Sequence, residues 1–402
     1  MQRDMLKFLK NIKGDKVIWI VVILLSIFSI LAVYSSTGTL AYRKQSGNTE
    51  YYLVKHFLIL AFGFALMYLT HLIKYTYYSR ISQIGLILTV PLLLLTLFSG
   101  TTLNEASRWL TVPIINLTFQ SSDVAKLFLI MYLARVLSKK QEAIKQFRSG
   151  FLPVIVPVII ICALILPSNF STAAILFVTC LVLMFIGRIS LKYILSLIGL
   201  GIASLALIFL LAKAFPDIFP RSETWISRVD TFINREEAGA DANYQIEQAK
   251  IAIVSGGILG KAPGKSTQRN FLPHPYSDFI FAIIIEEYGL IGGGVVLLLY
   301  WILFFRVIRI TTKCQGNFGA FLAIGIGFSL VFQAMINMAV AVNLFPVTGQ
   351  TLPLVSMGGT SIWFTSISIG IILSVSRRIE IETRDGMEIE ILNEPETKAM
   401  PA

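Results

Sequence analysis

Residues 278–305 read DFIFAIIIEEYGLIGGGVVLLLYWILFF, and this stretch decides the class of fold. Its charged residues are Asp278, Glu286 and Glu287, and from Tyr288 onward it carries no acidic or basic residue. A helix of about 20 mostly apolar residues is long enough to cross the hydrocarbon layer of a bilayer. The stretch therefore predicts a membrane-spanning helix with its carboxylates gathered toward one end.

The composition of the whole chain supports a membrane protein. Of its 402 residues, 55% are hydrophobic and 14% are charged, whereas a soluble domain has about 25% charged residues. This excludes a soluble enzyme, a disordered chain and a collagen-like chain. The three cysteines and three histidines show no spacing typical of a disulfide framework or a metal site.

The apolar stretches predict an all-α, polytopic bundle of about ten transmembrane helices. We expect residues 1–16 to form a cytoplasmic N-terminus, 17–376 the membrane domain, and 377–402 an acidic, disordered cytoplasmic tail. The predicted spans are 17–36, 55–73, 81–99, 121–138, 151–167, 172–187, 193–214, 278–305, 318–344 and 355–376.

The placement of lysine and arginine predicts the orientation of the bundle, because cytoplasmic loops carry an excess of these residues. Basic residues cluster before the first span and after the fourth and the eighth, whereas the connections after the fifth and the ninth contain none. Both termini are therefore expected in the cytoplasm. The net charge of +11 then needs no nucleic-acid partner.

The long connection 215–277 is predicted to lie outside the cell. Within it Arg221, Arg228 and Arg235 recur every seven residues, which on a helix places them along one face beside an apolar stripe. This pattern is typical of a helix that lies in the membrane interface on the outer side. A solvated face on a helix packed against the protein is an equally good interpretation.

Further along the same loop, glycines alternate with Lys261, Lys265 and Arg269. Glycine allows the backbone to approach a ligand closely, and basic side chains suit phosphate. The pattern matches no P-loop, so by itself it is a weak indication of a phosphate site.

Ionisable residues within the spans are candidates for function, because a charge at membrane depth is costly. Asp123 and Lys126 lie at the outer end of the fourth span, and Glu286 and Glu287 lie in the eighth. Lys126 is expected to pair with Glu286 or Glu287, as a structural ion pair or near a cavity.

Asp278 opens the eighth span and has two interpretations. It is either the N-cap of that helix, for which Asp is a favoured residue, or a functional carboxylate. Gln333 and Asn337 share one face of the ninth span, where hydrogen bonds between helices explain them adequately.

Taken in order along the chain, these residues resemble the SEDS family, which includes FtsW, RodA and SpoVE. The resemblance covers roughly residues 17–376. There are departures: Gln120-Ser121-Ser122-Asp123 lacks the proline of the usual Gln-Pro-Ser-Glu, and His274 replaces a glutamate. The motifs that carry the resemblance are Arg108-Trp109, Phe119 to Asp123 with Lys126, Ser171-Thr172-Ala173, Gln245 to Gln248, Gly256-Gly257, Leu272-Pro273, Asp278 to Ala282, Glu286 to Gly289, Gln333, Asn337, Pro346 to Gly349 and Gly358-Gly359.

The resemblance implies a peptidoglycan glycosyltransferase of the bacterial inner (cytoplasmic) membrane that polymerises lipid II. It is closer to the FtsW type, which acts in cell division, than to the RodA type. The implied partners are a class B penicillin-binding transpeptidase and other membrane proteins of the divisome or elongasome. The resemblance also implies Asp278 as the catalytic carboxylate and places Arg108 and Trp109 in the substrate site.

The reaction suggests roles for further residues. A sugar hydroxyl attacks the anomeric carbon of a second lipid-linked unit, and undecaprenyl pyrophosphate leaves. Asp278 is expected to act as the general base, or to position the acceptor or a divalent cation. Arg228, Lys265 and Arg269 are expected to stabilise the pyrophosphate, with Mg²⁺ bridging its oxygens.

Lys126 and Glu286 are also candidate substrate-binding residues, and as a pair they are expected to tune access to the cavity. Two other functions stay open from the sequence alone. One is a transporter (flippase) for the lipid-linked precursor, and the other is a scaffold that activates the transpeptidase. A RodA-type elongation polymerase is the alternative within the family.

Overall fold

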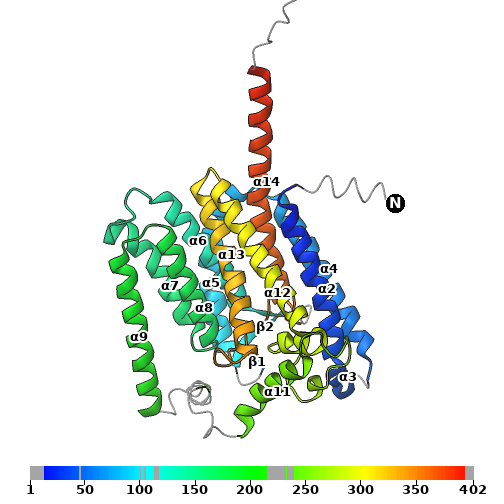
Figure 1. The fold of residues 1–402 in the computed structure, drawn as a ribbon. Helices are drawn as coiled ribbons and strands as arrows, with labels where there is room; N and C mark the ends of the chain where they lie inside the picture. The colour runs from blue at the N-terminus through cyan, green and yellow to red at the C-terminus, as the bar shows by residue number, and fades with distance from the viewer. Residues whose placement is uncertain are drawn as a thin grey trace, which may run out of the picture.

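The protein is an all-α helical bundle with one small sheet (Figure 1). The computed structural model describes residues 13–44, 47–99, 101–103, 106–112, 117–214, 232 and 240–393. A helix coincides with each of the ten predicted spans, which confirms the polytopic fold. These helices are α2 (Lys16–Ser36), α4 (Thr49–Leu72), α5 (Tyr75–Ser99), α6 (Ser121–Lys139), α7 (Leu152–Ile165), α8 (Phe170–Ile186), α9 (Leu191–Ala214), α12 (Ile280–Lys313), α13 (Asn317–Ala341) and α14 (Ser361–Asn393).

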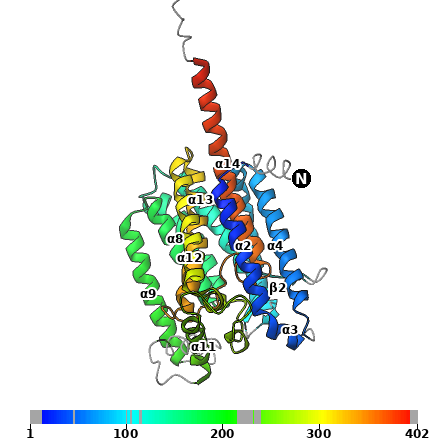
Figure 2. The same cartoon turned by 45° about the vertical axis from the view of Figure 1, so that its right-hand side comes forward.

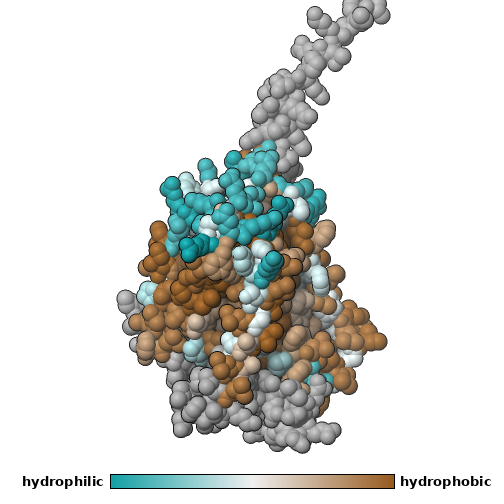
Figure 3. Space-filling view, turned by 90° about the vertical axis from the view of Figure 1, so that its left-hand side faces the viewer, coloured by the Kyte–Doolittle hydropathy of each residue, from teal (hydrophilic) through white to brown (hydrophobic). Residues whose placement is uncertain are grey.

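Most of these helices have the length and the apolar composition needed to cross a bilayer. Seven spans in the described chain are both long and apolar enough to cross it, including the π-helical turn Phe147–Phe151 joined to α7. α8 and residues 191–207 of α9 are shorter apolar helices. α6 is too polar to be among these apolar spans, because it carries Asp123, Lys126 and Arg135. On the face shown in Figure 3, hydrophobic side chains form a broad belt, and hydrophilic ones gather at the end where α14 projects.

The two ends of the bundle differ. α2 begins and α14 projects at one end, whereas α3 (Gly38–Lys44), α11 (Ala240–Gly256) and the sheet lie at the other (Figure 1). α13 packs against α12, α6, α14 and α8 and is largely buried, whereas α9 lies at the edge beside α8 (Figure 2). Cap residues mark the starts of several helices: Asp15 accepts from two amides of α2, and Asn169 accepts from Thr172 of α8.

The sheet was not predicted from the sequence. β1 (Thr101–Leu103), β2 (Ala106–Val112) and β3 (Leu117–Gln120) are antiparallel in the order β1-β2-β3. Trp109 of β2 pairs with Gln120, directly before α6. Thr360 Oγ1 donates to the Thr118 carbonyl at 3.2 Å, which ties β3 to the start of α14. The sheet therefore lies at the same end of the bundle as Asp123 and Lys126.

Two helix boundaries correct the sequence predictions. α14 begins at Ser361, not near 355, and it continues to Asn393, so the tail is helical where the structure describes it. α12 begins at Ile280 and is broken at Gly289, whose φ of 70° and ψ of −175° are non-helical. Glycine tolerates this conformation because it lacks a Cβ. The break leaves a short helix, residues 280–288, between Asp278 and the main span.

Candidate active site

Asp278 lies in the turn before α12 and is half-buried. The N-cap of α12 is Phe279, one residue later, so the interpretation of Asp278 as the N-cap residue was wrong. Ser277 Oγ donates to Asp278 Oδ1 at 2.8 Å. The carboxylate thus lies just before the start of a spanning helix and is partly accessible.

The turn that carries Asp278 is fixed to the connection between α13 and α14. Ser356 Oγ donates to the Ser277 carbonyl at 2.6 Å, and the Met357 amide donates to the Tyr276 carbonyl at 2.9 Å. Burial raises the pKa of the Tyr276 phenol, and the charges of Tyr52 and Asp278 act in the same direction. The neutral phenol therefore persists beside Asp278 at physiological pH.

Two amides on α13 bind the same connection. Asn337 Nδ2 donates to the carbonyls of Asp278 and Gln350, at 3.0 and 2.7 Å. Gln333 Nε2, one turn away, donates to the Thr351 carbonyl at 3.0 Å. Both side chains are buried. Gln333 also joins two helices as expected, because its Oε1 accepts from Lys126 of α6. Asn337 binds the turn of the candidate catalytic residue and the connection, and not another helix.

Lys126 does not pair with either glutamate of α12. Its Nζ donates to Gln333 Oε1 at 2.8 Å and lies 3.6 Å from Asp123 Oδ1, one turn away on the same helix. The predicted pair with Glu286 was therefore wrong. Through Gln333, Lys126 is linked to Thr351 in the connection between α13 and α14, which also holds the turn of Asp278.

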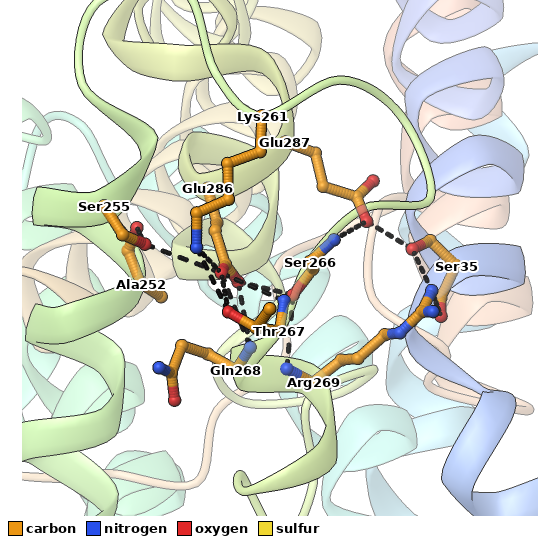
Figure 4. A network of polar contacts seen from close by, with 10 residues as sticks. All are labelled: Ser35, Ala252, Ser255, Lys261, Ser266, Thr267, Gln268, Arg269, Glu286 and Glu287. Carbon is orange, nitrogen blue, oxygen red and sulfur yellow. Dashed lines mark hydrogen bonds and ion pairs between the residues drawn. The ribbon is translucent and has the colours of Figure 1, made fainter.

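The Glu286 carboxylate is fully buried and is surrounded by donors from residues 261–268 (Figure 4). Lys261 Nζ donates to Oε1 at 2.8 Å, and the Thr267 amide and hydroxyl donate to the same oxygen at 3.0 and 2.9 Å. Ser266 Oγ donates to Oε2. Glu286 thus anchors the loop after α11, and its oxygens are already used by the protein, so the structure gives no support to its predicted role in substrate binding.

Glu287 anchors a different part of the same region. It accepts from Ser35 Oγ on α2 and from the Ser266 amide at 3.3 Å (Figure 4). Arg269 Nη1 donates to the carbonyl and the hydroxyl of Ser35, at 2.9 and 3.0 Å. In this arrangement Arg269 binds α2, so it would need to leave Ser35 to reach a pyrophosphate. Ser35 gives no signal in the sequence, since it lies in an apolar span.

Two glycines of the loop, Gly256 and Gly260, lie close against the backbone of α12. The amides of Lys261 and Ala262 donate to the carbonyls of Glu286 and Glu287, at 2.9 and 3.0 Å. The Leu290 amide in turn donates to the Gly257 carbonyl at 2.9 Å. Methyl groups added at Gly256 and Gly260 would collide with the backbone of α12. The spacing that suggested a phosphate loop therefore serves a close contact between two backbones.

The other predicted residues are placed as follows. Lys265 is exposed on the loop between α11 and α12. Trp109 is half-buried on β2, and for Arg108 the structure describes the backbone of the same strand. Arg228, and the helix expected around it, lie outside the described residues. The structure brings Lys126, Gln333, Asn337 and Asp278 into one linked region and leaves Glu286 and Arg269 in a second.

Asp278 could bind Mg²⁺ only as a single carboxylate that shares the ion with substrate phosphates. Among the described residues, no group of three or more His, Cys, Asp or Glu side chains could hold a metal ion. Mg²⁺ commonly binds through one or two carboxylates together with substrate phosphates. The Asp278 carboxylate fits that arrangement, with the remaining ligands coming from the phosphates and water.

Comparison with known proteins identifies the family. The family model described as a cell cycle protein, FtsW/RodA/SpoVE, matches residues 15–381. The chain belongs to this family. A probable peptidoglycan glycosyltransferase FtsW of Trichlorobacter lovleyi is 32% identical over 93% of this chain and 96% of its own length. The stage V sporulation protein E of Bacillus subtilis is 32% identical over 92% of this chain and 98% of its own.

Solved structures share the fold. A chain in a structure of a peptidoglycan synthase complex, which coordinates polymerisation and crosslinking, is 26% identical with a TM-score of 0.67, over 90% of this chain and 98% of its own. RodA of Thermus thermophilus, at 22% identity and a TM-score of 0.65, covers 92% of this chain and 98% of its own. This member of the FtsW/RodA/SpoVE family is therefore an integral membrane protein and a SEDS peptidoglycan glycosyltransferase.

Proposed function

We propose that this protein polymerises lipid II into glycan strands, with Asp278 as the catalytic carboxylate. The observation that supports this role is the position of Asp278, a partly exposed carboxylate on a turn whose backbone is held by Asn337, Ser356 and Met357. A rigidly held carboxylate at the level where lipid headgroups meet water suits proton transfer from a bound sugar.

The proposed step is a glycosyl transfer. Asp278 accepts the proton of the attacking sugar hydroxyl, whose oxygen bonds to the anomeric carbon of the second lipid II molecule. The bond from that carbon to the pyrophosphate oxygen breaks, and undecaprenyl pyrophosphate leaves with the electron pair. Lys265, Arg228 and an Arg269 released from Ser35 are the proposed cations for the leaving group, and Arg108 and Trp109 are proposed substrate contacts.

A Mg²⁺ ion is a proposed helper of this step. When bound by Asp278 and the phosphate oxygens, it would supply positive charge to the leaving pyrophosphate. The chain's own contribution is to hold the Asp278 carboxylate in place.

Family membership supports a proposal for the localisation and the partners. We propose that the protein lies in the bacterial cytoplasmic membrane with both termini inside. α2 begins and α14 projects at one end of the bundle (Figure 1), and the basic residues before the first span support a cytoplasmic position for that end. A class B penicillin-binding transpeptidase is the proposed partner, in line with the fold shared with a peptidoglycan synthase complex. Several relatives are named FtsW, which supports a role in division.

Asp278→Asn tests the proposal. The variant should insert normally and lose polymerisation of purified lipid II by roughly 100-fold or more, as expected for loss of a general base. Glu142→Gln is the matched control, because Glu142 is an exposed carboxylate in the loop after α6. Normal glycan product from Asp278→Asn would overturn the assignment, and transbilayer movement of lipid II without glycan would indicate a transporter.

A further inference from the structure

Asn337 makes an unusual pair of contacts for an amide inside a spanning helix. It is 1% exposed on α13, and its single Nδ2 group donates to the carbonyl of Asp278 and to that of Gln350. These two carbonyls belong to segments that are 72 residues apart in the sequence (350 − 278). One side chain therefore fixes the distance between the turn of Asp278 and the connection before α14.

The connection held by Asn337 faces the Asp278 carboxylate. A methyl group at Gly349 would lie 3.7 Å from Asp278 Oδ2, so the backbone at Gly349 passes directly beside that oxygen. The next residue, Gln350, is held from the other side, because its Nε2 donates to Thr172 Oγ1 on α8 at 2.9 Å. Movement of this segment toward or away from Asp278 is thus controlled by α13 and α8.

We propose that Asn337 is a positioning residue for the glycosyl transfer: its amide sets where the Asp278 carboxylate stands relative to the 349–351 backbone. This inference rests on the proposed function of Asp278. Asn337 acts through the backbone of the turn and does not contact the sugar. A displacement of about 1 Å in a reacting group can cost about 100-fold in rate, so losing this contact should slow the chemical step.

A packing role for Asn337 makes a different prediction. Asn337→Leu keeps a similar volume and removes both hydrogen bonds, whereas Asn337→Ser is smaller and keeps one hydroxyl donor. If packing mattered, the Leu variant would be the more active one. If the donors matter, the Ser variant should be the more active one despite the space it leaves.

The experiment is steady-state polymerisation of lipid II by the full chain, alone and with its transpeptidase partner. We expect kcat to fall about 100-fold for Asn337→Leu and about tenfold for Asn337→Ser, with KM for lipid II within about twofold of wild type. Ser329→Ala is the control on the same helix, because Ser329 is buried and its hydroxyl has no hydrogen-bond partner among the described residues. It should retain wild-type kcat.

Three outcomes would overturn the inference: wild-type kcat in Asn337→Leu, a Leu variant more active than the Ser variant, or a rise in KM with unchanged kcat. If the Leu variant does not insert, the Ser variant still tests the proposal through its kcat and KM. Full activity in Asp278→Asn would instead refute the proposed function, so the two failures are distinguishable.

Discussion

Removing the amine of Lys261 should destabilise the protein, because Glu286 would keep a buried charge without its cation. Glu286 is 0% exposed, and the Lys261 Nζ lies 2.8 Å from its Oε1. Loss of one partner from a fully buried pair costs roughly 3–5 kcal/mol. The Lys261 side chain is 30% exposed, so water can reach part of the site, and donors from Ser266 and Thr267 remain. We therefore expect Lys261→Met to lower the free energy of unfolding by about 2 kcal/mol.

The assay is equilibrium unfolding of the purified protein in mixed micelles, followed by tryptophan fluorescence. The double variant Lys261→Met, Glu286→Gln should recover about 1 kcal/mol of the loss, since it removes the unpaired charge and keeps an acceptor for the loop. Lys265→Met is the matched control, because Lys265 is an exposed lysine on the same loop; its effect should stay within about 0.5 kcal/mol.

Wild-type stability in Lys261→Met would refute the reasoning. It would show that water or the remaining donors fully replace the interaction of Lys261 with the Glu286 carboxylate. A double variant whose loss equals the sum of the two single losses would refute it in another way, because it would show that Lys261 and Glu286 do not interact.

Three further predictions concern other contacts. Gly289→Ala should prevent stable folding, seen as aggregation in size-exclusion chromatography, because a Cβ there collides with the Ile258 carbonyl at a positive φ; Gly294→Ala, which meets no neighbour, should behave as wild type. Swapping charges in Lys126→Glu, Glu286→Lys should give no more polymerisation than the two single changes combined, because the residues have separate partners; recovery of activity would contradict this. Chelation by EDTA should lower polymerisation by at least tenfold and added Mg²⁺ should restore it, and an unchanged rate would exclude a divalent cation.

The fold was largely predictable because it depends on a one-dimensional signal. Apolar runs of about 20 residues must form helices in a bilayer, where the backbone polar groups find no water. The boundaries were less predictable near residues that do not follow this rule. Gly289 breaks α12 within an apolar run, and the sequence does not distinguish such a glycine from Gly292 or Gly293, which stay helical.

The candidate site was predictable in its residues and not in its pairings. Asp278, Lys126 and Asn337 were each identified as polar residues at membrane depth. Which of these residues contact one another depends on how the helices are arranged and how the loops fold back. Such contacts between distant segments leave no regular spacing in the sequence. The pair of Lys126 with Glu286 was inferred from opposite charge alone; in the structure Glu286 instead meets Lys261, whose loop returns to α12 after α11.

The two polar networks act on opposite ends of one short helix. At the start of residues 280–288, Asn337 holds the backbone of Asp278; at the end, Glu286 and Glu287 bind residues 261–268 and Ser35. The non-helical Gly289 separates this helix from the rest of α12. Packing also holds this short helix, because Ile280, Ile283 and Ile284 are fully buried in the apolar core. The polar contacts therefore add to a placement that packing already supports. Glu286 and Glu287 thus tie the end of this helix to the loop and to α2, and their cost at membrane depth is offset by the donors of the loop that they hold.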